Sequence, residues 1–196
     1  MSFRMRLLRH FENVPADLKG AVIAIGNFDG VHRGHRAVLA RAKAEAERRK
    51  AKLGVLTFEP HPRSFLKPGG APFRLTPFRI KMRHLQDLGV DVAFVLTFDA
   101  DMVKRTADVF VKDVLVDGLG VAHVVIGADF CFGDECRADH GTRLVPAHRA
   151  AAADLADVVF DDVAGSRRLA ELTLVDRHHV DDVRPVGFVE LDGDRA

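Results

Sequence analysis

The chain has few of the features that mark secreted, membrane or nucleic-acid-binding proteins. Its 196 residues include two cysteines, Cys131 and Cys136, too few for a disulfide framework or a complete zinc site. No apolar run is long enough to span a membrane, and the N-terminal residues 1–14 interrupt their apolar positions too often for a signal peptide. A net charge of +1 gives no general attraction to nucleic acid or to membrane surfaces. We therefore expect a cytoplasmic protein whose partners are small molecules; the oligomeric state is not indicated.

Short apolar runs alternate with helical patterns along the first two thirds of the chain. The runs that predict buried strands are residues 21–25, 52–58, 90–96 and 121–127. The patterns that predict helices are residues 35–50, 76–88 with Thr76 as N-cap and Pro77 in the first turn, and 107–118. Because strands that alternate with helices form parallel sheets through right-handed crossovers, we predict an α/β fold with a doubly wound, Rossmann-like parallel sheet.

The remaining segments give weaker patterns. Residues 5–13 alternate weakly and predict either an edge strand or an ordered lead-in, and residues 63–75 are predicted as loop. Beyond residue 134, we predict a helix over 145–157, a short strand over 158–160 and a short helix over 167–174.

The strongest motif is AVIAIGNFDGVHRGHRAVL, residues 21–39. An apolar strand ends at a glycine-bracketed turn, residues 26–30, and a helix begins directly after it. The unpaired N–H groups of the first helical turn and the positive end of the helix dipole both face such a turn. This arrangement predicts a binding site for phosphate.

Two histidines open the predicted helix. His32 and His35 lie three residues apart, hence on one face, and Gly34 between them lets a ligand approach the backbone. Imidazole donors aimed at phosphate can stabilise the charge that develops during phosphoryl transfer. The alternative is that the two histidines only cap the helix or contact solvent. A zinc site is disfavoured because no third ligand lies nearby in the sequence.

Three loops follow the carboxyl ends of predicted strands: residues 26–30, 57–62 and 129–133. Since ligands of parallel sheets gather at this edge, the three loops are expected to converge on one site.

Four blocks, GNFDGVHRGH, TFEPHP, LTPFRIKMRHLQDLGVD and VIGADFCFG, occur in this order. Over about residues 5–133 they resemble the adenylyltransferase module of prokaryotic bifunctional riboflavin kinase/FMN adenylyltransferases, the FAD synthetases. The H-x-G-H element alone indicates only the nucleotidyltransferase superfamily, and the other three blocks make the flavin assignment specific.

The resemblance implies transfer of AMP from ATP to FMN, which yields FAD and pyrophosphate, with Mg²⁺. It implies that His32 and His35 are the catalytic pair. The residues implied in ATP binding are Gly26, Asn27, Phe28, Asp29, Gly30, Gly34 and Arg167. Those implied in FMN binding are Phe58, Pro60, His61, Pro62, Asp129 and Phe130. The metal ligands are not indicated.

Each of the flavin-side residues also has a structural interpretation. The phenylalanines offer flat walls to an isoalloxazine ring, but they are equally ordinary core residues. His61 can reach a phosphate or face solvent from its loop, and Asp129 can bind a flavin edge or cap a turn. Lys81 matches a position of the family, and we interpret it as a surface or ion-pair residue of a helix.

The resemblance weakens after Gly133, where two acidic residues replace a basic stretch of the family. Residues 163–168 retain a serine and an arginine of the family's ATP-contacting segment, and Arg167 is the candidate there. A second alignment places this stretch beyond that segment, in which case the arginine loop is absent. No riboflavin kinase module is visible. We therefore predict a nucleotidyltransferase domain over 1–160 and an atypical appendage over 161–196.

Two other functions remain open from the sequence. One is a non-catalytic relative that binds flavin or nucleotide, and the other is a nucleotidyltransferase acting on a different small phosphate acceptor.

Overall fold

The computed structural model describes residues 5–66, 74–127 and 171–175. Within them, the chain forms a six-stranded sheet in the order β1-β4-β3-β2-β5-β6. Every neighbouring pair of strands is parallel. The strands are β1 (Arg6–Leu8), β2 (Val22–Ile25), β3 (Leu53–Glu59), β4 (Val92–Thr97), β5 (His123–Gly127) and β6 (Glu171–Val175).

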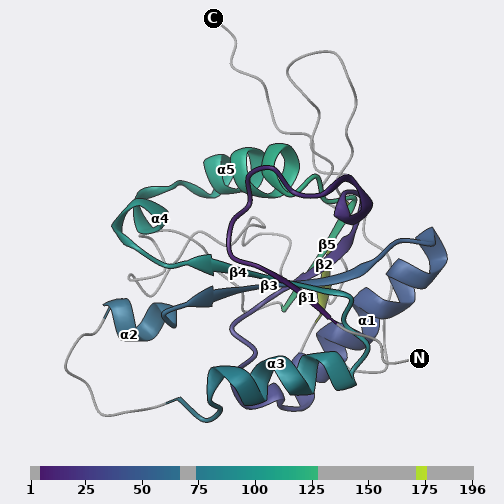
Figure 1. Ribbon diagram of the computed structural model, residues 1–196, viewed down its shortest axis with the longest axis horizontal. Coiled ribbons are helices and arrows are strands. Elements are labelled where there is room, and N and C mark those ends of the chain that lie inside the picture. Colours follow the sequence, from purple (N-terminus) through teal and green to yellow (C-terminus); the bar gives the residue numbers. More distant parts are fainter. Residues whose placement is uncertain (1–4, 67–73, 128–170, 176–196) are drawn as a thin grey trace, which may run out of the picture.

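Helices cover both faces of this sheet, as Figure 1 shows. The helices on one face are α1 (Arg33–Arg49) and α3 (Phe78–Asp87). On the other face, α5 (Ala107–Val109) continues directly into η3 (Phe110–Gly118), which has π-helical hydrogen bonding. The shorter elements are η1 (Ala16–Leu18), η2 (Asp29–Val31), α2 (Pro62–Leu66) and α4 (Ala100–Lys104).

The sheet separates two hydrophobic clusters. Val38 and Leu39 of α1 pack with Met82 and Leu85 of α3 against one face. Phe110, Val111, Val114 and Leu115 of η3 pack against the other. Because both faces are covered, the central strands are buried along nearly their whole length, which explains why they are continuous apolar runs in the sequence.

The strand order places a topological switch point at β2. From β2 the chain adds β3 and then β4 on one side, and it then crosses the sheet to place β5 on the other side of β2. Crossovers leave opposite faces at such a point, and the carboxyl ends of the two strands border a crevice where ligands bind. The glycine turn of residues 26–30 follows β2 at this position.

The predicted doubly wound parallel sheet is confirmed, and the four predicted strands and the long helix after the glycine turn are present. The weak pattern at residues 5–13 contains the edge strand β1.

Two local predictions are wrong. Residues 63–66 were predicted as loop but belong to α2. The His61 carbonyl accepts the N–H groups of Ser64 and Phe65 and so starts the helix. Pro62 fits the first turn, because its missing N–H would have no partner within the helix there. Thr76 is not the N-cap of α3; Pro77 takes that position.

A third prediction, a helix over residues 167–174, is wrong for residues 171–174, because the alternating residues of β6 pair with β5. β6 lies within the segment 161–196, and the domain boundary at residue 160 stays a prediction. The predicted helix over 145–157 and strand over 158–160 lie outside the described residues.

Among the described residues, no helix is both long and apolar enough to cross a lipid bilayer.

Candidate active site

The chain reverses direction tightly between β2 and α1. Phe28, Gly30 and Val31 all have positive φ angles, of +50°, +73° and +39°. Such a conformation is unfavourable for a β-branched residue such as Val31 and persists only where the surrounding contacts impose it. We call residues 26–30 the nucleotide loop, after the ATP-binding role that the family resemblance predicts for them.

Phe28 anchors this loop from within. Its side chain is fully buried, and its ring lies 5.2 Å from the ring of His35, centroid to centroid. A Cβ atom at Gly26 would contact the Phe28 ring at 3.4 Å, so glycine allows the ring to fold back under the loop. Of the predicted ATP-binding residues, Phe28 is therefore an internal support of the loop and is not exposed at its surface.

The two histidines stack at the start of α1. Their ring centroids are 3.7 Å apart with an interplanar angle of 21°. The Nδ1 atom of His32 accepts a hydrogen bond from the His35 N–H at 3.4 Å and so caps the helix. When neutral, His32 consequently carries its proton on Nε2, where it is a donor. A Cβ at Gly34 would lie 3.3 Å from the His32 ring, so glycine leaves room for this arrangement.

Behind the nucleotide loop, three polar groups form a closed triangle. The carbonyl oxygen of Asn27 accepts hydrogen bonds from the Thr57 hydroxyl at 3.3 Å and from the Lys81 ammonium at 3.1 Å. Lys81 Nζ also donates to Thr57 Oγ1 at 3.3 Å. Thr57 comes from β3 and Lys81 from α3, so two separate elements fix the first half of the loop.

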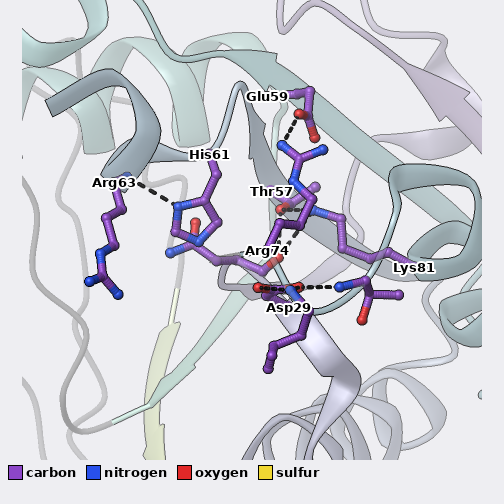
Figure 2. Close-up of polar contacts among 10 residues, drawn as sticks. Asp29, Thr57, Glu59, His61, Arg63, Arg74 and Lys81 are labelled. Carbon is purple, nitrogen blue, oxygen red and sulfur yellow. Dashed lines mark hydrogen bonds and ion pairs between the residues drawn. The ribbon is translucent and has the colours of Figure 1, made fainter. Parts of the chain in front are cut away.

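The second half of the loop is held by the backbone just before α3. The Asp29 carboxylate accepts the N–H of Leu75 at 2.9 Å and the N–H of Thr76 at 2.9 Å. In return, the Gly30 N–H donates to the Thr76 hydroxyl at 2.9 Å. Dashed lines in Figure 2 mark the hydrogen bonds that the Asp29 carboxylate accepts. The carboxylate of Asp29 thus acts inside the protein as a loop anchor.

Lys81 is buried, with 5% of its surface exposed. The interpretation of Lys81 as a surface or ion-pair residue is therefore wrong. Its position in the helix carried the signal: Phe78, Lys81 and Leu85 share the face of α3 that packs on the sheet. Burial lowers the pKa of Lys81, partly offset by the charges of Glu59 and Asp29.

His61 lies at the end of β3, near the same network (Figure 2). Its Nδ1 atom accepts the N–H of Arg63 at 3.1 Å. Burial lowers the pKa of His61 below its usual value, so the imidazole is neutral at pH 7. Nearby, Arg74 forms an ion pair with Glu59.

A row of phenylalanines leads from the core to the surface beside His61. The Phe58 side chain is only 4% exposed, and its ring packs edge-on against Phe98 at 5.5 Å. Phe98 in turn packs edge-on against Phe65 at 5.7 Å, and Phe65 is 38% exposed. Phe58 thus lies at the buried end of the row. Phe65 and Phe98 were not among the residues predicted to bind FMN, although Phe65 lies only three residues beyond Pro62.

Pro60 is exposed, and Pro62 is half-buried at the start of α2. Three predicted site residues, Asp129, Phe130 and Arg167, lie outside the described residues.

Comparison with known proteins decides the family. Residues 14–156 match the family model of FAD synthetase. The chain belongs to the FAD synthetase family. The family resemblance found from the four sequence blocks is thereby confirmed.

Two bacterial relatives share about two fifths of their residues with the chain over the aligned region. It is 42% identical to the bifunctional riboflavin kinase/FMN adenylyltransferase of Escherichia coli K12 over 130 residues, 66% of this chain and 42% of that protein. It is 43% identical to the protein of the same name from Pseudomonas fluorescens over 129 residues, 66% of this chain and 41% of that protein. The chain thus matches less than half of the length of these relatives.

A solved structure shares the fold. A crystal structure described as a macrolide-efflux protein from Streptococcus pneumoniae superposes with a TM-score of 0.58 at 23% identity, over 66% of this chain and 42% of that chain. At this identity the likeness supports the fold alone.

Proposed function

We propose that this protein transfers the adenylyl group of ATP to the phosphate of FMN, which yields FAD and pyrophosphate. The observation that carries the proposal is the nucleotide loop of an FAD synthetase family member, anchored from behind and opening onto two stacked histidines at a helix N-terminus. Such a site suits a reaction that depends on holding and stabilising phosphates.

In the proposed reaction, an oxygen of the FMN phosphate attacks the α-phosphorus of ATP. A new phosphorus–oxygen bond forms to FMN as the bond between the α-phosphorus and the bridging oxygen breaks, and pyrophosphate leaves on the opposite side. The attacking phosphate is already an anion, so no general base is needed. Catalysis then consists of positioning and charge stabilisation.

The residues at the start of α1 would supply that stabilisation. In this scheme, the Nε2–H of His32, the imidazole of His35 and the helix N-terminus would face the phosphoryl oxygens that gain charge. The stacked geometry supports a joint role, since both rings then present donors from nearly the same place.

The flavin would lie on the side of β3 and α2. The exposed ring of Phe65 offers a flat apolar face, and the ring of Phe98 supports it in edge-on contact. This apolar face follows Pro60, His61 and Pro62 in the sequence. Because its pKa is lowered, His61 is neutral and can donate a hydrogen bond without adding a charge to the site.

Magnesium would arrive as part of the ATP substrate. Among residues 5–66 and 74–127, no three His, Cys, Asp or Glu side chains are grouped to hold a metal ion, and Asp29 is already engaged with two backbone amides. Mg²⁺ commonly binds through substrate phosphates and water with few protein ligands, so this donor set suits a magnesium–ATP complex. A cytoplasmic location and the lack of nucleic-acid partners stay predictions.

The experiment is to incubate the purified protein with ATP, Mg²⁺ and FMN and to measure FAD and pyrophosphate. We expect His32→Ala to lower kcat by about 100-fold or more, since it removes a donor to the transition state. His84→Ala is the matched control, because His84 is an exposed histidine of α3, and its activity should equal that of the wild type.

Other outcomes identify the two alternatives. Binding of FMN or ATP without FAD formation indicates a non-catalytic binding protein. Turnover of ATP with a phosphate acceptor other than FMN indicates a different nucleotidyltransferase. Equal loss of activity in both histidine variants would contradict the assigned role of His32.

A further inference from the structure

Lys81 is a buried cation that forms no ion pair within the described part of the chain. Its side chain is 5% exposed, and no carboxylate of the described residues lies within ion-pair distance of its ammonium group. The two nearby carboxylates are engaged elsewhere: Glu59 pairs with Arg74, and Asp29 accepts the amides of Leu75 and Thr76. Burying a charge in this way costs folding free energy, so its presence suggests that the charge has a function.

The fold does not require the positive charge. Both hydrogen bonds of the ammonium group go to neutral oxygens, the Asn27 carbonyl and the Thr57 hydroxyl. The Thr57 hydroxyl itself donates to Asn27, so that carbonyl keeps a partner when the ammonium group is removed. A neutral, apolar side chain of equal length at position 81 would therefore leave no buried carbonyl without a hydrogen bond.

The place of the charge suggests its use. The carbonyl that accepts from Lys81 belongs to the peptide group whose other end is the N–H of Phe28, within the nucleotide loop. A cation at the carbonyl end polarises this peptide group and strengthens the hydrogen bond that holds it in place. The ammonium also adds a fixed positive potential directly behind a loop expected to receive polyphosphate.

We propose that Lys81 is a positioning residue for ATP: from behind the nucleotide loop, its buried ammonium group fixes the Asn27 carbonyl and supplies the positive charge that the phosphates of ATP require. Lys81 touches neither substrate in this scheme and acts through the loop. The inference rests on the proposed function, because it takes ATP as the ligand of that loop.

The test compares Lys81→Met with the wild type. Methionine is unbranched and one heavy atom shorter than lysine, and it removes the charge. The matched control is Lys104→Met, which removes a lysine that is 76% exposed on α4. For each protein, the KM values for ATP and FMN, kcat, the affinity for magnesium–ATP by titration calorimetry, the melting temperature and the hydrogen exchange of residues 26–30 are measured.

We expect Lys81→Met to weaken ATP binding and raise the KM for ATP by about tenfold or more, with faster exchange of the loop amides. The KM for FMN should stay within about twofold of the wild-type value, since the flavin side keeps its contacts. The melting temperature should stay unchanged or rise, because replacing a buried charge by an apolar group is often neutral or stabilising. Lys104→Met should match the wild type in every measurement.

A purely structural role of Lys81 would give the opposite pattern. The melting temperature would fall, while the folded variant would bind ATP as the wild type does, and this result would overturn the proposal. If Lys81→Met does not fold, Lys81→Gln retains a donor without the charge, and the same loss of ATP affinity is expected of it. Wild-type affinity in a folded Lys81→Gln protein would then refute the requirement for charge.

The measurements separate this inference from the proposed function. If the wild type binds ATP but forms no FAD, the proposed function fails, and Lys81 is still judged by the ATP affinities of the variants. If the wild type forms FAD and Lys81→Met binds ATP equally well, only the inference about Lys81 fails.

Discussion

Two charged side chains, Lys81 and Glu45, are buried on the same side of the sheet, and they are treated in opposite ways. Glu45 lies in the second half of α1 and accepts hydrogen bonds from the guanidinium groups of both Arg48 and Arg49. These partners, together with the charge of His123, lower its pKa to about 2 against the opposing effect of burial. Among the residues that the structure describes, Lys81 has only neutral oxygens as hydrogen-bond partners, and burial lowers its pKa.

This difference indicates that the two buried charges serve different purposes. At the Glu45 end of α1, the charge is neutralised locally and serves the folded state. At the other end, where α1 begins, Lys81 forms no ion pair with any described residue, and its charge lies behind a loop with strained backbone angles. An unpaired positive charge is expected in a site preorganised for anionic phosphates, because the bound ligand then neutralises the positive potential.

Acid should remove the contribution of Glu45 to stability. The folded pKa of about 2 lies below the ordinary value of 4.5, so the stabilisation is present above pH 4.5 and is lost as the pH falls toward 2. At pH 3 the wild type should have lost about 2 kcal/mol of this stabilisation. Denaturant unfolding of the wild type and of Glu45→Gln across pH 3–6 measures it. The gap in unfolding free energy between the two proteins should shrink at low pH, and a constant gap would show that Glu45 is not held ionised by its partners.

On the loop side, Thr76→Val should affect ligand binding as well as stability. The hydroxyl of Thr76 is the acceptor for the Gly30 N–H, and valine keeps the shape of the side chain but removes that acceptor. We expect a loss of about 1 kcal/mol in unfolding free energy and a severalfold rise in the KM for ATP.

The matched control is Thr106→Val. The Thr106 hydroxyl also accepts a backbone N–H, that of Val109, but at the start of α5 on the other face of the sheet. A similar loss of stability with an unchanged KM for ATP is expected of it. If both threonine variants change ATP binding equally, the contacts around the nucleotide loop have no special role.

The sequence was sufficient where the determining contacts are local. The apolar strand, the glycines of the loop and the two histidines lie within 15 residues of one another, and their conformation follows from the strand, turn and helix signals of that stretch. The alternating order of strands and helices likewise predicted the parallel sheet, because crossover connections permit few other arrangements.

The sequence was insufficient where contacts join distant residues. The bonds from Asp29 to Leu75 and Thr76 span 46 and 47 residues, and the bond from Lys81 to Asn27 spans 54. Lys81 was interpreted as a surface or ion-pair residue, although its helical spacing from Phe78 and Leu85 indicates the inner face of α3. Only the fold brings that face against the back of the nucleotide loop. Thr76 shows the same limit, since its local signal was that of a helix cap and its partner in the structure is Gly30.

The most direct test of adenylyl transfer to FMN follows the phosphorus atoms of ATP. The purified chain is incubated with Mg²⁺, FMN and ATP labelled at either the α- or the γ-phosphorus, and FAD and pyrophosphate are separated and counted. Transfer of the adenylyl group to FMN predicts that the α-label appears in FAD and the γ-label in pyrophosphate. Absence of the α-label from FAD, in a preparation that binds ATP and FMN, would contradict it.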